Sequence, residues 1–202
     1  MNKFYIPEIS MRDIRNTTDI LSKFENKEFN GEGYPSDFFV KKVIEVKPDQ
    51  VTLVPDPPGA LTSSFGWDCE TNKNLLTDVV SEFKSNNIRV SIFINPSIKT
   101  LENLEVIKTD RVELYTFDYA HNFNENKEKA IKDYINVTNY LEKEFPKIEL
   151  NAGHDLNLEN LKFFLDKINN IKEVSIGHAL ICDTFEFGLQ ETIKKYLTLT
   201  NN

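Results

Sequence analysis

The fold class of this chain is decided by two similar stretches, Glu149-Leu-Asn-Ala-Gly-His154 and Glu173-Val-Ser-Ile-Gly-His178. Each is a short run typical of a strand, and each ends in glycine followed by histidine. Glycine lets the backbone turn sharply or approach a ligand, and histidine exchanges protons near neutral pH. The two stretches are one strand-helix unit apart, so we expect both Gly-His pairs at the same edge of a parallel sheet.

The rest of the chain repeats this alternation of short apolar runs and longer amphipathic segments. Within residues 37–46, for example, Phe39, Val40 and Val43 recur on one helical face. The predicted strands are 3–6, 28–32, 50–55, 89–95, 111–116, 147–153 and 173–178. The predicted helices are 14–24, 36–46, 72–86, 98–106, 125–145, 158–168 and 180–199.

Alternating strands and helices with short connections predict an α/β fold with a parallel sheet. A doubly wound open sheet usually carries a glycine-rich turn after its first strand, and this chain has none. Polar residues instead follow many strands, as in a TIM-type (β/α)8 barrel. We therefore predict a single barrel domain over residues 1–202, with about seven recognisable βα units and the first unit missing.

Composition limits the possible functions of the chain. The 202 residues include 40% hydrophobic and 28% charged residues, with a net charge of −8. This acidity argues against nucleic acid as a partner but permits small phosphorylated substrates. No apolar run approaches the length needed to span a membrane, and the first residues do not resemble a signal peptide. We expect a cytoplasmic protein in which Cys69 and Cys182 are reduced, partly buried thiols.

Two acidic residues on predicted strands are candidates for acid–base chemistry. Glu32 ends a strand between two glycines, in Phe29-Asn-Gly-Glu-Gly33. Glu113 alternates with Arg111 and Tyr115, so these three side chains share one face of their strand. A carboxylate at a barrel mouth can act as a general base. The structural alternatives are a surface turn for Glu32 and a salt bridge towards the helices for Glu113.

The two histidines of the Gly-His pairs are candidates for proton transfer or for binding an anion. Gly177-His178 begins the last connection of the chain, where many barrels bind phosphate through backbone N–H groups. A simple tight turn is the structural alternative. The third histidine, His121, falls in a polar stretch that predicts a loop, where its side chain is expected to be solvated.

The segment 53–68 is the longest predicted loop and is rich in proline, glycine and hydroxyl residues. Long loops in compact domains usually have a function. Its hydroxyl residues Thr62 and Ser63 are candidate donors to a substrate oxygen.

Together these motifs resemble the pyridoxine 5′-phosphate synthase family, barrel enzymes that close the ring of vitamin B6. The resemblance runs in order from about residue 28 to residue 199, whereas residues 1–27 diverge. It is carried by Lys47-Pro-Asp-Gln-Val-Thr-Leu-Val-Pro55, Leu61-Thr-Ser63, Gly66-Trp-Asp68, Ile88-Arg-Val-Ser-Ile-Phe93, Asp110-Arg-Val-Glu-Leu-Tyr-Thr116, Leu150-Asn-Ala-Gly-His-Asp155 and Val174-Ser-Ile-Gly-His-Ala-Leu180.

The resemblance implies a reaction and a set of site residues. The family condenses 1-deoxy-D-xylulose 5-phosphate with 3-amino-2-oxopropyl phosphate and releases phosphate and water, without a metal or a redox cofactor. Its members form homo-oligomers. By this resemblance Glu32 is the acid-base glutamate, His154 the proton donor and Glu113 the transition-state stabiliser. The implied substrate contacts are Thr62 for the deoxyxylulose phosphate and Asp155, Gly177 and His178 for the aminoketone phosphate.

The beginning of the chain departs from the family pattern. The Asn-x-Asp-His motif of the family's first strand is missing, and Ile6, Glu8 and Asp13 stand where the family has histidine, arginine and histidine. Asp155 replaces a glycine that is common in the family. These departures leave two hypotheses open. The chain is a pyridoxine 5′-phosphate synthase, or it is an amino-terminally truncated or divergent homologue that is inactive and binds phosphate or a partner.

Overall fold

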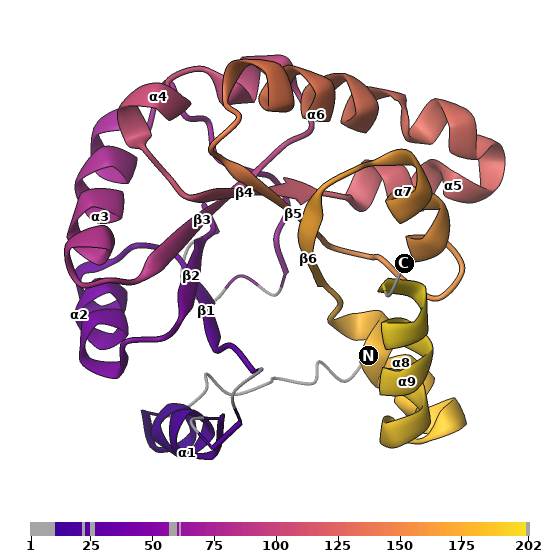
Figure 1. The fold of residues 1–202 in the computed structure, drawn as a ribbon, viewed down its shortest axis with the longest axis horizontal. Coiled ribbons are helices and arrows are strands. Elements are labelled where there is room, and N and C mark those ends of the chain that lie inside the picture. The colour runs from indigo at the N-terminus through magenta and orange to yellow at the C-terminus, as the bar shows by residue number, and fades with distance from the viewer. Residues whose placement is uncertain (1–10, 22, 25–26, 57–59, 61, 201–202) are drawn as a thin grey trace.

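A curled parallel sheet forms the centre of the protein in the computed structural model, which describes residues 11–21, 23–24, 27–56, 60 and 62–200. Six strands pair in sequence order, each parallel to the next. The sheet curls so that its helices lie mainly outside it, and it forms roughly half of a barrel (Figure 1). The strands are β1 (Asn30–Gly33), β2 (Gln50–Leu53), β3 (Arg89–Ile94), β4 (Arg111–Tyr115), β5 (Glu149–Gly153) and β6 (Ile171–Ser175).

Helices follow the strands along the chain. Helices α2, α3, α4 and α6 run along the convex side of the sheet, and α8 and α9 pack together beyond β6 (Figure 1). The helices are α1 (Met11–Leu21), α2 (Asp37–Val46), α3 (Lys73–Ser85), the 3₁₀ helix η1 (Ile98–Leu101), α4 (Leu104–Ile107), α5 (Phe117–Ala130), α6 (Lys132–Glu144), α7 (Leu161–Lys167), α8 (His178–Phe187) and α9 (Leu189–Thr200).

The core lies between the convex face of the sheet and the outer helices. Outward-facing strand residues such as Val51 and Ile92 are fully buried there, together with Leu76 of α3. Helix α2 begins at a capping residue, because the hydroxyl of Ser36 accepts the backbone N–H of Phe39 at 3.2 Å. The apolar periodicity of the sequence thus corresponds to real burial against the sheet.

The strand-helix alternation predicted from the sequence is confirmed for the six strands above. The predicted strand over residues 3–6 lies outside the described residues, as do Ile6 and Glu8. Within the described ranges, β1 and β6 each pair with a single neighbouring strand. Both edges of the curled sheet are therefore available to further chain or to another subunit.

The polar stretch before residue 125 is helical, so the prediction of a loop there was wrong. Helix α5 begins at Phe117 and includes His121, whose ring stacks on that of Phe117 at 5.7 Å. Non-helical angles at Asn126 kink α5, and a second helix, α6, begins at Lys132. The single helix predicted over 125–145 is therefore two helices. The helix predicted over 98–106 likewise consists of η1 and α4.

Three further predictions need correction, two of them at the carboxyl-terminal end of the chain and one on the cysteines. The last strand ends at Ser175, so His178 is the first residue of α8 and not the end of a strand. The helix predicted over 180–199 is divided into α8 and α9 at Gly188, which has a φ of 78°. The two thiols are both free, but Cys69 is buried whereas Cys182 is exposed.

The concave face of the sheet is unusually polar, and its amino-terminal end holds a network of charges. The guanidinium of Arg111 donates to Glu149 at 2.8 Å, to the side-chain oxygen of Gln50 at 2.9 Å and to Glu173 at 3.2 Å. The Arg111 side chain is only 10% exposed. This network lies at the amino-terminal end of the sheet, whereas an open cavity lies at the carboxyl ends of the strands.

Candidate active site

The concave face brings the two predicted acidic residues together near the carboxyl ends of the strands. Glu113 stands in the middle of β4. As the strand period predicted, it lies on the same face of the strand as Arg111 and Tyr115, the concave face of the sheet. Glu32 stands on the edge strand β1, near enough that its charge acts on Glu113. The site therefore contains two carboxyl groups from strands that are not adjacent in the sheet.

Glu113 is enclosed, with only 2% of its surface exposed. Its pKa is raised to about 8, mainly by burial and further by the charge of Glu32, while hydrogen bonds from Ser175 and Thr52 offset part of the rise. Its Oε2 atom has no hydrogen-bond partner among the described residues. Glu113 is therefore protonated at neutral pH and presents a neutral carboxyl group to the site.

The close approach of Glu113 explains why glycine precedes His154. A Cβ atom at Gly153 would lie 2.1 Å from Glu113 Oε1 and 2.8 Å from the Cβ atom of Ser175. Any larger residue would displace the carboxyl group or force β5 and β6 apart. The first Gly-His pair thus serves to admit an acidic side chain beside the strand.

Glu32 differs from Glu113 because its side chain remains accessible to solvent within the hollow of the sheet. The pKa of Glu32 is raised mainly because the surrounding protein partly removes its carboxyl group from water. The negative charges of Asp56 and Glu173 raise this pKa further. A carboxyl group with a raised pKa and access to solvent can both accept and return a proton.

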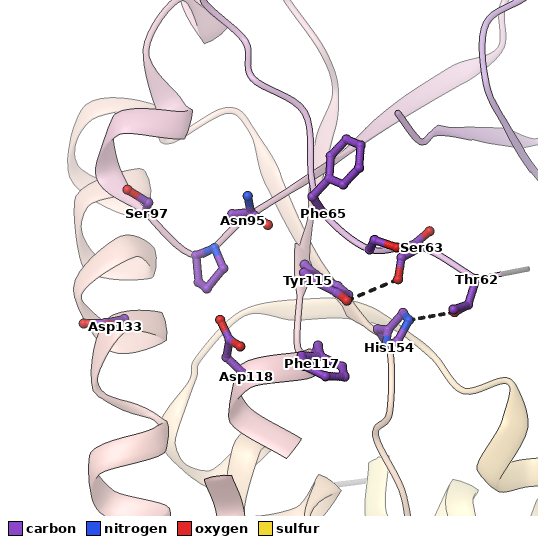
Figure 2. Close-up of a pocket in the computed structure, with 12 residues that line it drawn as sticks. Thr62, Ser63, Phe65, Asn95, Ser97, Tyr115, Phe117, Asp118, Asp133 and His154 are labelled. Carbon is purple, nitrogen blue, oxygen red and sulfur yellow. Dashed lines mark hydrogen bonds between the residues drawn. The ribbon is translucent and has the colours of Figure 1, made fainter. Parts of the chain in front are cut away.

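His154 lies directly after β5 and is held in one position (Figure 2). The hydroxyl of Thr116 donates to the carbonyl oxygens of Gly153, at 2.8 Å, and of His154. The imidazole packs edge-on against the rings of Tyr115 and Phe117, with distances between ring centroids of 4.8 Å and 6.0 Å. Its Nε2 atom lies 3.0 Å from the hydroxyl of Thr62, so the structure joins two residues that the sequence placed 92 positions apart.

An open cavity of about 620 Å³ lies beside His154 and covers the carboxyl ends of β3, β4 and β5 (Figure 2). The phenol of Tyr115 crosses it and donates to the carbonyl oxygen of Ser63 at 3.2 Å. Among the described residues that line it, none is lysine or arginine. The lining residues are Thr62, Ser63, Ser64, Phe65, Asn95, Pro96, Ser97, Tyr115, Phe117, Asp118, Asp133 and His154.

The second Gly-His pair lies at the same edge of the sheet but does not line this cavity. Gly153 of β5 is in register with Ser175 of β6, two residues before Gly177. Gly177 precedes α8 without a side-chain cap, and a Cβ atom there would have no neighbour within 4 Å. Both Gly177 and His178 are exposed, so the backbone N–H groups at this helix start are open to a ligand.

The sequence interpretation did not single out several residues of the site. Tyr115 could have been found, because strand period places it on the same face as Glu113. Phe117 and Asp118 could not, since the segment after β4 was predicted as a loop. Asp56 could not have been found either. Its charge raises the pKa of Glu32 because the curvature of the sheet and the path of the loop after β2 bring the two residues close.

The fold defines the class of the protein: a curled parallel α/β sheet of the TIM-barrel type, with two carboxyl groups and a histidine near the carboxyl ends of its strands. The chain belongs to the family described as pyridoxal phosphate biosynthesis protein PdxJ, whose model matches residues 8–202. The resemblance found in the sequence is therefore confirmed.

Individual relatives agree with this family. The chain is 48% identical to the pyridoxine 5′-phosphate synthase of Cytophaga hutchinsonii over 177 residues, which are 88% of this chain and 74% of that protein. It is 49% identical to the pyridoxine 5′-phosphate synthase of Parabacteroides distasonis, over 87% of this chain and 73% of that protein.

Solved structures of other proteins share the fold. A mutant tryptophan synthase α-subunit from Pyrococcus furiosus superposes with a TM-score of 0.60 at 13% identity, covering 96% of this chain and 75% of that one. In the described part of the chain, no helix is long and apolar enough to cross a membrane. The same part contains no group of three or more histidine, cysteine, aspartate or glutamate side chains placed to hold a metal ion.

Proposed function

We propose that this chain condenses 1-deoxy-D-xylulose 5-phosphate with 3-amino-2-oxopropyl phosphate to form pyridoxine 5′-phosphate, phosphate and water. The observation that carries the proposal is the convergence of Glu32, Glu113 and His154 on one mouth of a barrel of this family. The three residues come from different strands: Glu32 lies in β1, Glu113 in the middle of β4, and His154 directly after β5.

The reaction consists of proton transfers, which suit these residues. The amine of one substrate attacks the ketone of the other, and the hydroxyl group that forms must leave as water with a proton from an acid. His154 is the proton donor through Nε2, which faces the cavity. Glu32 takes protons from the substrate and returns them, because a raised pKa lets it hold either form.

Glu113 acts differently from Glu32 in this scheme. Since its pKa is raised to about 8, it enters the reaction as a neutral carboxyl group that donates a hydrogen bond. A donor of this kind stabilises an oxygen that gains negative charge in the transition state. No step of the proposed reaction requires a metal or a redox cofactor.

Phosphate recognition is proposed for the start of α8. The backbone N–H groups from Gly177 onwards and the exposed side chain of His178 suit an anion at this edge of the sheet. Thr62 and Asp155 both lie beside His154, which supports their proposed role as substrate contacts. Phosphate should raise the melting temperature of the wild-type protein and should do so less for Gly177→Pro, which removes one backbone N–H group.

Two properties of the whole protein are part of the proposal. The net charge of −8 fits small phosphorylated substrates better than nucleic acid. The free thiols Cys69 and Cys182 fit the reducing cytoplasm, where we place the protein. A homo-oligomer would cover the open edges of the sheet.

Complementation tests the proposed function in a cell. A bacterium that lacks its own pyridoxine 5′-phosphate synthase needs added pyridoxine to grow. This chain should restore growth without pyridoxine, and its His154→Ala variant should not. Failure of the wild-type chain to rescue growth, with folded protein present at normal abundance, would favour the alternative of an inactive homologue that binds phosphate or a partner.

A further inference from the structure

Asp155 places a carboxylate against the imidazole of His154. Its Oδ2 atom lies 3.2 Å from His154 Nδ1, the ring nitrogen that does not contact Thr62. Nδ1 is shielded from solvent and makes no aligned hydrogen bond within the described part of the chain. The carboxylate therefore supplies negative charge to a ring nitrogen that otherwise lacks a polar partner.

The backbone holds these two side chains next to each other at an energetic cost. Both residues have positive φ angles, 91° for His154 and 58° for Asp155, which side chains rarely adopt. The carbonyl oxygen of Asp155 accepts the side-chain amide of Asn160 at 3.1 Å, and that of His154 accepts the hydroxyl of Thr116. Strain held by surrounding contacts is typical of functional positions.

The remaining contacts of the imidazole leave Nε2 as the nitrogen that faces the cavity. Tyr115 and Phe117 flank the ring, and the hydroxyl of Thr62 meets Nε2 (Figure 2). The other charged groups of this region are acidic: Asp118 and Asp133 line the cavity, and Glu113 lies against Gly153. Among the acidic residues that the structure describes, only Asp155 lies against Nδ1 of His154.

We propose that Asp155 is a positioning residue for His154: its carboxylate keeps a proton on Nδ1 and holds the ring with Nε2 towards the substrate. A negative charge close to one ring nitrogen favours the proton on that nitrogen, and Asp155 Oδ2 lies 3.2 Å from Nδ1. When Nε2 exchanges a proton with the substrate, Nδ1 keeps its own proton beside the carboxylate. This inference rests on the proposed function, in which His154 is the proton donor.

The alternative role is that Asp155, which by the family resemblance stands where many members have glycine, only repels the phosphate of a substrate. The two roles predict opposite kinetics. For a positioning residue, Asp155→Asn and Asp155→Gly should lower kcat roughly 10- to 100-fold with little change in KM. For a repelling residue, both variants should lower KM and leave kcat unchanged, and this result would overturn the proposal.

The variants are chosen to separate charge from backbone strain. Asparagine keeps the size of the side chain without its charge, and glycine suits the positive φ of this position. Glu159→Gln removes an exposed negative charge from the same segment and should keep wild-type kcat and KM. Thermal unfolding of each variant confirms that a lower kcat does not come from a smaller folded fraction.

Nitrogen-15 NMR of the imidazole rings gives a readout that needs no turnover. The chain has three histidines, so His154→Gln assigns the His154 signals by their loss. At mildly alkaline pH the neutral ring should carry its proton on Nδ1 in the wild type and shift towards Nε2 in Asp155→Gly. The same tautomer in both proteins would overturn the positioning role. The spectra are recorded without substrates, so they test the positioning role even if the protein shows no turnover. Lack of turnover would therefore contradict only the proposed function.

Discussion

Glu113 and Glu32 show how one concave face can hold two carboxyl groups in different environments, which suit the different roles proposed for them. Glu113 is surrounded by protein and by other acidic groups, so it keeps its proton. Glu32 on the edge strand stays in contact with solvent and can exchange its proton. Environment and not residue type separates a hydrogen-bond donor from a base.

Replacing Glu113 with glutamine should change how stability depends on pH. In the native state Glu113 keeps its proton up to about pH 8, whereas in the unfolded chain it loses the proton near the ordinary value of 4.5. The wild type should therefore lose stability as the pH rises from about 4.5 to 8, by at most about 1.4 kcal/mol per pH unit relative to Glu113→Gln. Urea unfolding at several pH values measures this difference. Parallel curves for the two proteins would show that Glu113 ionises normally.

His154 is the residue whose loss should affect turnover most. Removing a positioned proton donor costs about 10²- to 10⁴-fold in rate, so His154→Gln should reduce kcat by this order. The control is His121→Gln, since His121 stacks on Phe117 outside the cavity lining. Equal rates for the wild type and His154→Gln would contradict the role assigned to His154.

At the scale of elements, most strands could be predicted because they are short apolar runs buried on the convex face. The start of α5 could not, because Phe117 to Asn126 has mainly polar residues and only Tyr119 of this helix is buried. The division of α8 from α9 depends on one glycine with a positive φ. The pairing of Glu32 with Glu113 depends on the curvature of the sheet, which no local pattern in the sequence encodes.

The loop after β2 depends on a glycine that lies against β3. A Cβ atom at Gly66 would fall 2.3 Å from backbone atoms of Ile94 and Asn95, which cannot rotate away. Gly66→Ala should lower the free energy of unfolding by at least about 1–3 kcal/mol. Gly31→Ala is the matched control, because the nearest atom to its Cβ, on Pro48, would be 4.0 Å away. Chemical denaturation compares the two, and equal losses would show that the close contact at Gly66 is not present.

At the scale of the whole molecule, the part of the chain that the structure describes has two sheet edges without a further strand and an exposed apolar surface. Helix α8 has no buried residue in the described structure, and it exposes Ile181 and Phe185, the latter at 88%. Exposed apolar surface of this kind usually marks an interface. Its position beside the edge strand β6 is consistent with the homo-oligomer that the family resemblance implies.

A charge on α8 should therefore change the assembly. We expect the wild type to sediment as a homo-oligomer and Phe185→Glu to shift towards the monomer, since a buried charge without a partner opposes association. Lys194→Glu, on an exposed polar position of α9, should leave the mass unchanged. Analytical ultracentrifugation gives the masses, and a monomeric wild type would remove the proposed oligomer.

In the proposed function, the groups at this barrel mouth close the pyridoxine ring. Phosphorus-31 NMR of the purified protein with both phosphorylated substrates tests it most directly, because substrates, product and released phosphate give separate signals. We expect pyridoxine 5′-phosphate and inorganic phosphate to appear together in equal amounts with the wild type and not with His154→Ala. Unchanged substrate signals with the folded wild-type protein, or equal product from both proteins, would contradict it.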